Sequence, residues 1–195
     1  MSERWLFAGL GNPGKKYQNN RHNIGFLLVD HFLKKHGSLS FKVADGAEVA
    51  SVSLRANEGV ANEIFLIKPQ EFMNNSGRSI AAFMRYREIK PSNLVVIHDE
   101  VEIPFDTMRF KLGGGNAGHN GIKSTSAHLG TGEFFRLRLG VGRPAHPDFD
   151  LADWVLSNFS TEESRQLDDF LDRASSGLIS LLQDGLAKTQ AKFNS

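Results

Sequence analysis

The chain alternates between short apolar runs and stretches in which apolar residues recur every three or four positions. Runs rich in β-branched and aromatic residues predict β-strands, and the stretches with three-to-four spacing predict helices. The strongest strand candidates are 4–10, 48–55, 62–68, 93–98 and 134–141, and the weaker ones are 39–44 and 107–112. Strands that alternate with helices are typical of an α/β fold. We therefore expect a single three-layer α/β/α domain with a twisted mixed β-sheet and helices on both faces.

Polar residues mark where the helices should begin. Asn23 precedes one apolar stripe, and Asn75 or Ser76 precedes another; short polar side chains at these places can accept hydrogen bonds from free helix amides. Ser160 is followed three positions later by a glutamate, which is the capping-box pattern. The long stripe after Ser160 predicts a pair of C-terminal helices, with a break near 175–177.

Composition restricts the class of protein. A chain of 195 residues is long enough to bury its own core, and we expect one domain over 1–195 without repeats or linkers. No apolar run approaches the ~20 residues that cross a bilayer, and the N-terminus lacks the pattern of a signal peptide. The chain has no cysteine, which excludes disulfides, thiolate catalysis and cysteine-ligated metals. We expect a cytoplasmic protein that does not bind membranes.

The charges are segregated although the net charge is only +1. Residues 107–147 contain six Lys or Arg against Glu133 alone, whereas residues 148–195 contain four Lys or Arg against nine Asp or Glu. A basic segment of this kind is typical of phosphate or nucleic-acid contact. A solvated basic face that is balanced by the acidic tail is the alternative.

The first loop contains a G-x-G-x-x-G pattern directly after an apolar run. Gly9, Gly11 and Gly14 match the fingerprint of a dinucleotide-binding turn, which places pyrophosphate on the amides at the start of a helix. Here no apolar periodicity begins before Ile24, so the helix starts too late. Pro13 also removes one of the amides that the phosphate would need. We therefore predict no bound cofactor.

The same loop ends in a histidine that could act as a base. A histidine takes up a proton near neutral pH, and a carboxylate that orients it makes it a more effective base. His22 is such a residue, and Asp99 at the end of a predicted strand is the candidate partner. A loop histidine without a function is the alternative. No G-x-S-x-G elbow is present, and the histidine spacings match no metal motif, which favours metal-free hydrolysis by a positioned water.

Asparagines are concentrated in the predicted loops that follow strands. Their amides offer donors and acceptors to a substrate with peptide and ester groups, although asparagine is also common in turns for conformational reasons. The residues are Asn12, Asn23, Asn74, Asn75, Asn116 and Asn120.

Several motifs occur in a characteristic order along most of the chain. They are Gly9-Leu10-Gly11-Asn12-Pro13-Gly14 with Tyr17 and Arg21-His22-Asn23, then Lys68-Pro69 with Met73-Asn74-Asn75-Ser76-Gly77, then His98-Asp99-Glu100, then Lys111-Leu112-Gly113-Gly114-Gly115 with Gly118-His119-Asn120-Gly121, and finally Arg136-Leu137-Arg138. Together they resemble the bacterial-type peptidyl-tRNA hydrolases. The acidic C-terminal segment carries little of this resemblance.

The resemblance implies a monomeric enzyme that hydrolyses the ester between a peptide and the terminal adenosine ribose of tRNA, and thereby recycles prematurely released peptidyl-tRNA. It implies that His22 activates water, that Asp99 orients His22, and that Asn12 belongs to the catalytic set. The other implied site residues are Tyr17, Met73, Asn74 and Asn120 for the substrate, and Lys111 and Arg138 for tRNA phosphate. Arg109 lies beside this basic pair, and we expect it to contact tRNA phosphate as well.

Three positions depart from the usual family pattern. Asn20 stands where threonine is usual, Glu71 where threonine is common, and Ala117 where glycine is frequent. Glu71 is expected to add negative charge near the substrate cleft. Relatives that assist RNA splicing in plant organelles without evident hydrolysis provide the alternative function, a non-catalytic RNA-binding module.

Overall fold

The computed structural model describes residues 3–37, 40–55 and 61–194. Seven strands form one sheet in the order β2-β3-β4-β1-β5-β7-β6. Their bounds are β1 Arg4–Gly9, β2 Lys42–Ala44, β3 Ala47–Arg55, β4 Ala61–Pro69, β5 Leu94–Glu100, β6 Met108–Leu112 and β7 Phe135–Gly140. Each predicted strand is therefore present. The weak candidate at 39–44 is shortened to β2, and its first residue lies outside the described residues.

The sheet is mixed, as predicted. Strands β4, β1, β5 and β7 run parallel to one another, whereas β2, β3 and β6 at the two margins pair antiparallel with their neighbours. The parallel strands end at the same edge, so the loops that follow them meet there. These loops carry most of the polar motifs of the sequence.

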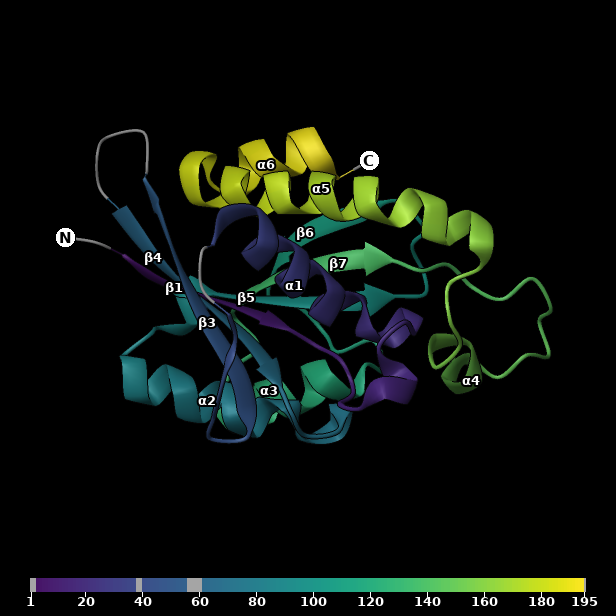
Figure 1. Ribbon diagram of the computed structural model, residues 1–195, viewed down its shortest axis with the longest axis horizontal. Helices are drawn as coiled ribbons and strands as arrows, with labels where there is room; N and C mark the ends of the chain where they lie inside the picture. Colours follow the sequence, from purple (N-terminus) through teal and green to yellow (C-terminus); the bar gives the residue numbers. More distant parts are fainter. Residues whose placement is uncertain (1–2, 38–39, 56–60, 195) are drawn as a thin grey trace.

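Helices cover both faces of the sheet, which confirms the three-layer α/β/α architecture (Figure 1). Helices α1 (Ile24–His36), α5 (Thr161–Asp184) and α6 (Leu186–Phe193) lie on one face. Helices α2 (Ser76–Arg87) and α3 (Asn120–Leu129) lie on the other. The short elements are α4 (Leu151–Val155) and the 3-10 turns η1 (Lys15–Tyr17), η2 (Arg21–Asn23), η3 (Met73–Asn75) and η4 (Pro91–Asn93).

Each face of the sheet has its own hydrophobic cluster. Phe7, Phe32 and Phe110 are fully or almost fully buried in the larger cluster, beneath α1, α5 and α6. Leu6 and Ile122 belong to the smaller cluster, beneath α2 and α3. Alternate residues of β1 thus enter opposite cores, because successive strand side chains point to opposite faces. This explains why the sequences of the central strands are continuous apolar runs.

The predicted break in the C-terminal helices is wrong in position. α5 runs without interruption through 175–177, and its Ser175 and Gly177 are buried. A Cβ at Gly177 would lie 2.7 Å from the Phe110 ring, so this glycine permits close packing of α5 on β6. The chain instead breaks at Gly185, which has a φ of 77°, a conformation that favours glycine.

The G-x-G-x-x-G glycines also have structural roles. A Cβ at Gly9 would lie 2.3 Å from the Gly25 carbonyl oxygen of α1, so this glycine lets β1 and α1 approach closely. Gly14 has a φ of 107°. The helix that follows begins only at Ile24, which agrees with the prediction that the loop is not a dinucleotide-binding turn. Among the described residues, no helix is both long and apolar enough to span a membrane.

Candidate active site

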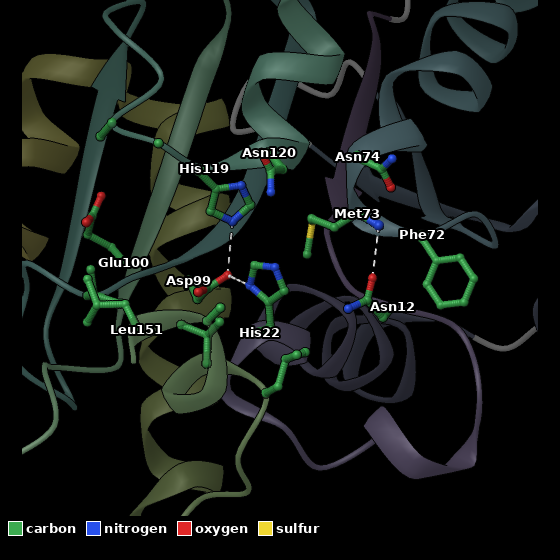
Figure 2. Close-up of a pocket in the computed structure, with 16 residues that line it drawn as sticks. Asn12, His22, Phe72, Met73, Asn74, Asp99, Glu100, His119, Asn120 and Leu151 are labelled. Atoms are coloured by element: carbon green, nitrogen blue, oxygen red, sulfur yellow. Dashed lines mark hydrogen bonds and ion pairs between the residues drawn. The ribbon is translucent and has the colours of Figure 1, made fainter. Parts of the chain in front are cut away.

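A cavity of about 690 Å³ opens at the carboxyl ends of the parallel strands (Figure 2). Its walls come from six separate stretches of the chain. The lining residues are Asn12, His22, Phe72, Met73, Asn74, Asp99, Glu100, Val101, Ala117, Gly118, His119, Asn120, Leu151, Ala152, Val155 and Leu156. The structure therefore brings together His22, Asp99, Asn12, Met73, Asn74 and Asn120, all of which the sequence singled out.

His22 is held by a short polar turn before α1. It lies in η2, and Asn23 beside it does not cap α1 with its side chain, contrary to expectation. Instead, Asn23 Oδ1 accepts a hydrogen bond from the Asn12 amide (2.9 Å), and Asn23 Nδ2 donates one to the Asn12 carbonyl (2.9 Å). These two bonds connect the loop after β1 to the turn that carries His22.

Asp99 lies at the end of β5, almost fully buried, and its Oδ1 atom contacts two histidines. It lies 2.8 Å from His22 Nδ1 and 3.0 Å from His119 Nε2. An ionised carboxylate only accepts hydrogen bonds, so both of these ring nitrogens carry protons. The unprotonated nitrogen of His22 is then Nε2, which points into the cavity (Figure 2). Asp99 thereby selects the tautomer that a general base requires.

His119 is a site residue that the sequence analysis did not identify. Its Nδ1 atom accepts hydrogen bonds from the amides of Gly121 (3.2 Å) and Ile122 (3.4 Å), so the side chain caps α3. The same side chain donates to Asp99 through Nε2. Its position between a glycine-rich loop and a helix was visible in the sequence, but its approach to Asp99 requires that the start of α3 lie near the end of β5 in the folded chain.

The electrostatics of this cluster follow from burial and from the shared carboxylate. Burial by itself would lower the pKa of His22, but the charge of Asp99 and their hydrogen bond outweigh burial, and the pKa is raised above its usual value of 6.5. Burial would raise the pKa of Asp99, yet His22 and His119 hold it well below its usual range. Burial and the neighbouring His119 lower the pKa of His98 to about 3, so His98 stays neutral.

The matched asparagines and Met73 surround His22. Asn12 is 8% exposed, and its Oδ1 accepts a hydrogen bond from the Met73 amide (2.9 Å). This bond leaves the Nδ2 group of Asn12 as the donor available to a ligand. Asn74 follows Met73 on η3 and lies on the same side of the cavity as Asn12, whereas Asn120, at the start of α3, lies nearer to His119 (Figure 2).

One wall of the cavity is apolar, and the sequence analysis did not predict it. Leu151, Val155 and Leu156 line the cavity from α4 and the residue after it. Phe72 lies at another side of the opening and is 56% exposed. Tyr17 is not among the described lining residues; its ring lies edge-on to Phe72, with centroids 6.4 Å apart.

The predicted phosphate-binding residues lie on one face of the sheet, next to the cavity. Arg109 pairs with Arg138, and Lys111 with Arg136, across β6 and β7, so all four side chains emerge on the same face. Arg109 and Lys111 are exposed. Arg138 donates from Nε (3.0 Å) and Nη2 (2.9 Å) to Glu100, which lines the cavity. Buried Arg136 donates to two carbonyls of the 113–115 loop.

The three residues that depart from the family pattern lie outside the cluster of His22, Asp99 and His119. Glu71 lies outside the described cavity lining and pairs with Arg78 (3.4 Å), which offsets part of its charge. Ala117 lines the cavity with a φ of 45°, a conformation that glycine adopts more readily. Asn20 is buried and bridges to Asn158.

The cluster also has the composition of a metal site. Ligand atoms of His22, Asp99 and His119 lie within 4.8 Å of one another, and two imidazoles with a carboxylate are common ligands of Zn²⁺. Sequence spacing could not indicate this grouping, because each residue comes from a different element. The hydrogen bonds among the three residues account for their arrangement without an ion.

The chain matches the family model described as peptidyl-tRNA hydrolase over residues 6–195. It belongs to the peptidyl-tRNA hydrolase family. A member from Bdellovibrio bacteriovorus is 42% identical over 97% of this chain and 99% of its own length. One from Geotalea uraniireducens is 44% identical over 97% of this chain and 95% of its own length.

Solved structures agree with the sequence comparison. The crystal structure of peptidyl-tRNA hydrolase from Acinetobacter baumannii has a TM-score of 0.86 and 30% identity to this chain, and it covers 100% of this chain and 96% of its own. The predicted family, fold class and reaction class are therefore confirmed: this member of the peptidyl-tRNA hydrolase family is an ester hydrolase that acts on peptidyl-tRNA.

Proposed function

We propose that His22 is the general base of this reaction and that Asp99 orients it. The observation that carries the proposal is the 2.8 Å contact between His22 Nδ1 and Asp99 Oδ1. It leaves His22 Nε2 free to accept a proton from water. The water oxygen then attacks the ester carbonyl carbon, and Asp99 stabilises the imidazolium that forms.

The attack places negative charge on the carbonyl oxygen, and Asn12 is suited to stabilise it. Its Oδ1 is occupied by the Met73 amide, so its Nδ2 donates. Collapse of the tetrahedral intermediate breaks the bond to the ribose oxygen, which takes up the proton held by His22. The products are a peptide with a free carboxylate and a tRNA with a free terminal hydroxyl. Asn74 and Asn120 bind the substrate near the scissile bond.

The surroundings of the cavity suggest how the two parts of the substrate are held. We assign the apolar wall of Leu151, Val155 and Leu156 to the peptide, together with Met73 in the cavity and Tyr17 beside Phe72 at its other side. The basic face of Arg109, Lys111 and Arg138 fits the phosphates of tRNA, since contacts to phosphate and shape allow one protein to bind many RNA sequences. One chain supplies the whole cavity, so we propose a monomer, and its site of action is the cytoplasm, where translation releases the substrate.

The direct test compares N-acetyl-aminoacyl-tRNA with unblocked aminoacyl-tRNA, in EDTA, with the unmodified chain and with His22→Ala. We expect rapid release from the blocked substrate only, and a loss of release in His22→Ala. Full activity in EDTA would support chemistry without a metal. Salt-sensitive tRNA binding without release would instead support a non-catalytic RNA-binding protein, and unchanged activity in His22→Ala would exclude this base.

A further inference from the structure

Arg21, the residue before His22, is a buried cation whose partners all lie in the C-terminal part of the chain. The residue is 3% exposed. Its Nη1 donates to Ser157 Oγ (2.7 Å) and to the Asn158 carbonyl (2.5 Å), and its Nη2 donates to Glu163 Oε2 (2.6 Å). A buried charge is destabilising unless it is paired and hydrogen-bonded. These contacts therefore hold η2 against the segment that follows α4.

The guanidinium also stacks on the helix that forms the apolar wall. Arg21 Cζ lies 3.7 Å from the centroid of the Trp154 ring, a geometry typical of a cation–π contact. The indole of Trp154 donates to the Gly142 carbonyl (2.8 Å). Trp154 lies in α4 between Leu151 and Val155, both of which line the cavity. Arg21 thus supports the wall from behind.

Glu163 extends this connection to α5. Its Oε2 accepts from Arg21 Nη2 and from the Ser160 amide (2.6 Å), and Ser160 in turn caps the helix. The capping box that starts α5 therefore also supplies the counter-ion of Arg21. By contrast, the orientation of His22 depends on Asp99 and on the bonds between Asn12 and Asn23, none of which involves the Arg21 side chain.

We propose that Arg21 is a positioning residue that holds α4 as the peptide-binding wall of the cavity and thereby sets how tightly the peptide part of the substrate binds. The inference rests on the proposed function, which assigns this wall to the peptide. Arg21 acts on binding through Trp154, and it leaves the base and its proton transfer unchanged.

The contact can be tested without any substrate. Trp5 and Trp154 are the two tryptophans of the chain, so Trp5→Phe makes Trp154 the sole tryptophan reporter. In this background Arg21→Lys is expected to shift Trp154 emission to longer wavelength and to increase its quenching by acrylamide. A lysine retains the charge but cannot make the forked, stacked contact. Unchanged emission and quenching in a folded variant would contradict the role of Arg21.

The kinetic test compares blocked substrates that carry one amino acid with those that carry a longer apolar peptide. For Arg21→Lys we expect KM for the longer peptide to rise roughly tenfold, since a single apolar contact in a pocket is worth about that much. KM for the short substrate, kcat for both and the acidic limb of the pH profile should stay unchanged. A binding role has this signature, whereas a general loss of structure lowers kcat for every substrate.

Two further variants, a control and a second test, separate the role of Arg21 from a general effect on α5. Arg165→Lys alters an exposed ion pair on α5 and should change nothing. If Arg21→Lys folds poorly, Glu163→Gln provides the test instead. Glu163→Gln keeps an acceptor for the capping box but loses the ion pair with Arg21, so it should raise KM for the longer peptide by a smaller factor. An equal loss of kcat for both substrates, or an unchanged KM, would overturn the inference. If the unmodified chain hydrolyses no blocked substrate, the proposed function fails, and the fluorescence result still decides the Arg21 contact.

Discussion

Hydrogen bonds among three side chains determine which ring nitrogens of the two histidines carry protons. Asp99 Oδ1 accepts from both His22 and His119, and each histidine is thereby held in one tautomer. His119 uses its other nitrogen to cap α3. One buried carboxylate therefore orients His22 and also contacts the histidine that caps α3.

The raised pKa of His22 predicts the pH dependence of the reaction. Only the unprotonated imidazole can act as a base, so kcat/KM should fall as pH drops through a midpoint above 6.5, the usual value. Asp99→Asn removes the charge that raises this pKa, so the midpoint should move to lower pH while the rate falls on the order of 10²- to 10⁴-fold. A pH profile of both forms checks this. A midpoint that stays in place would show that another group controls it.

The two roles of His119 can be separated by substitution. His119→Asn keeps a good N-cap but loses the contact to Asp99, whereas His119→Ala loses both. We expect both variants to be slower by similar factors, and only His119→Ala to lose stability, by about 1 kcal/mol. Urea unfolding and hydrolysis assays measure the two effects. Equal stability of the two variants would contradict the capping role.

At the scale of elements, the cavity depends on close approaches between helices and strands. α2 and α3 meet where Gly77 of α2 faces Ser124 of α3, and the Gly77 amide donates to Ser124 Oγ (3.0 Å). A Cβ at Gly77 would lie 2.2 Å from the Ser124 carbonyl oxygen. The glycine therefore sets the distance between the helices that begin beside Asn74 and at Asn120.

Gly77→Ala should accordingly destabilise the protein by about 1–3 kcal/mol, because a packed interior resists added volume. Gly115→Ala is the matched control, since its Cβ would meet nothing within 4 Å. Thermal unfolding of both variants checks the prediction. A Gly77→Ala variant as stable as the control would show that α2 and α3 can move apart with little loss of stability.

At the scale of the whole molecule, basic and acidic segments occupy different surfaces. The cations of β6 and β7 lie on the α3 side of the cavity, and α5 with its many carboxylates covers the opposite face of the sheet (Figure 1). Such a separation favours one orientation of a polyanion as it approaches. We therefore expect tRNA to bind next to the cavity and away from the acidic helix.

Binding of tRNA should therefore weaken with salt. Each phosphate contact releases counter-ions, so Lys111→Ala should reduce the slope of log affinity against log salt by about 1. Lys188→Ala on α6, across the sheet, is the control and should leave the slope unchanged. Binding titrations with deacylated tRNA at several salt concentrations measure this slope. Equal slopes of log affinity against log salt for the two variants would show that tRNA does not contact Lys111.

The strands, the fold class, the family and most polar residues of the cavity could be predicted before the structure, because they follow from local periodicity and from motifs that lie within short segments. Three features could not be predicted in this way: the contact of His119 with Asp99, the apolar wall that α4 supplies, and the continuation of α5 to Gly185. Each of these depends on contacts between residues far apart in the chain. Ser175 and Gly177 suggested a helix break by local propensity, but burial against β6 outweighs propensity within a packed helix.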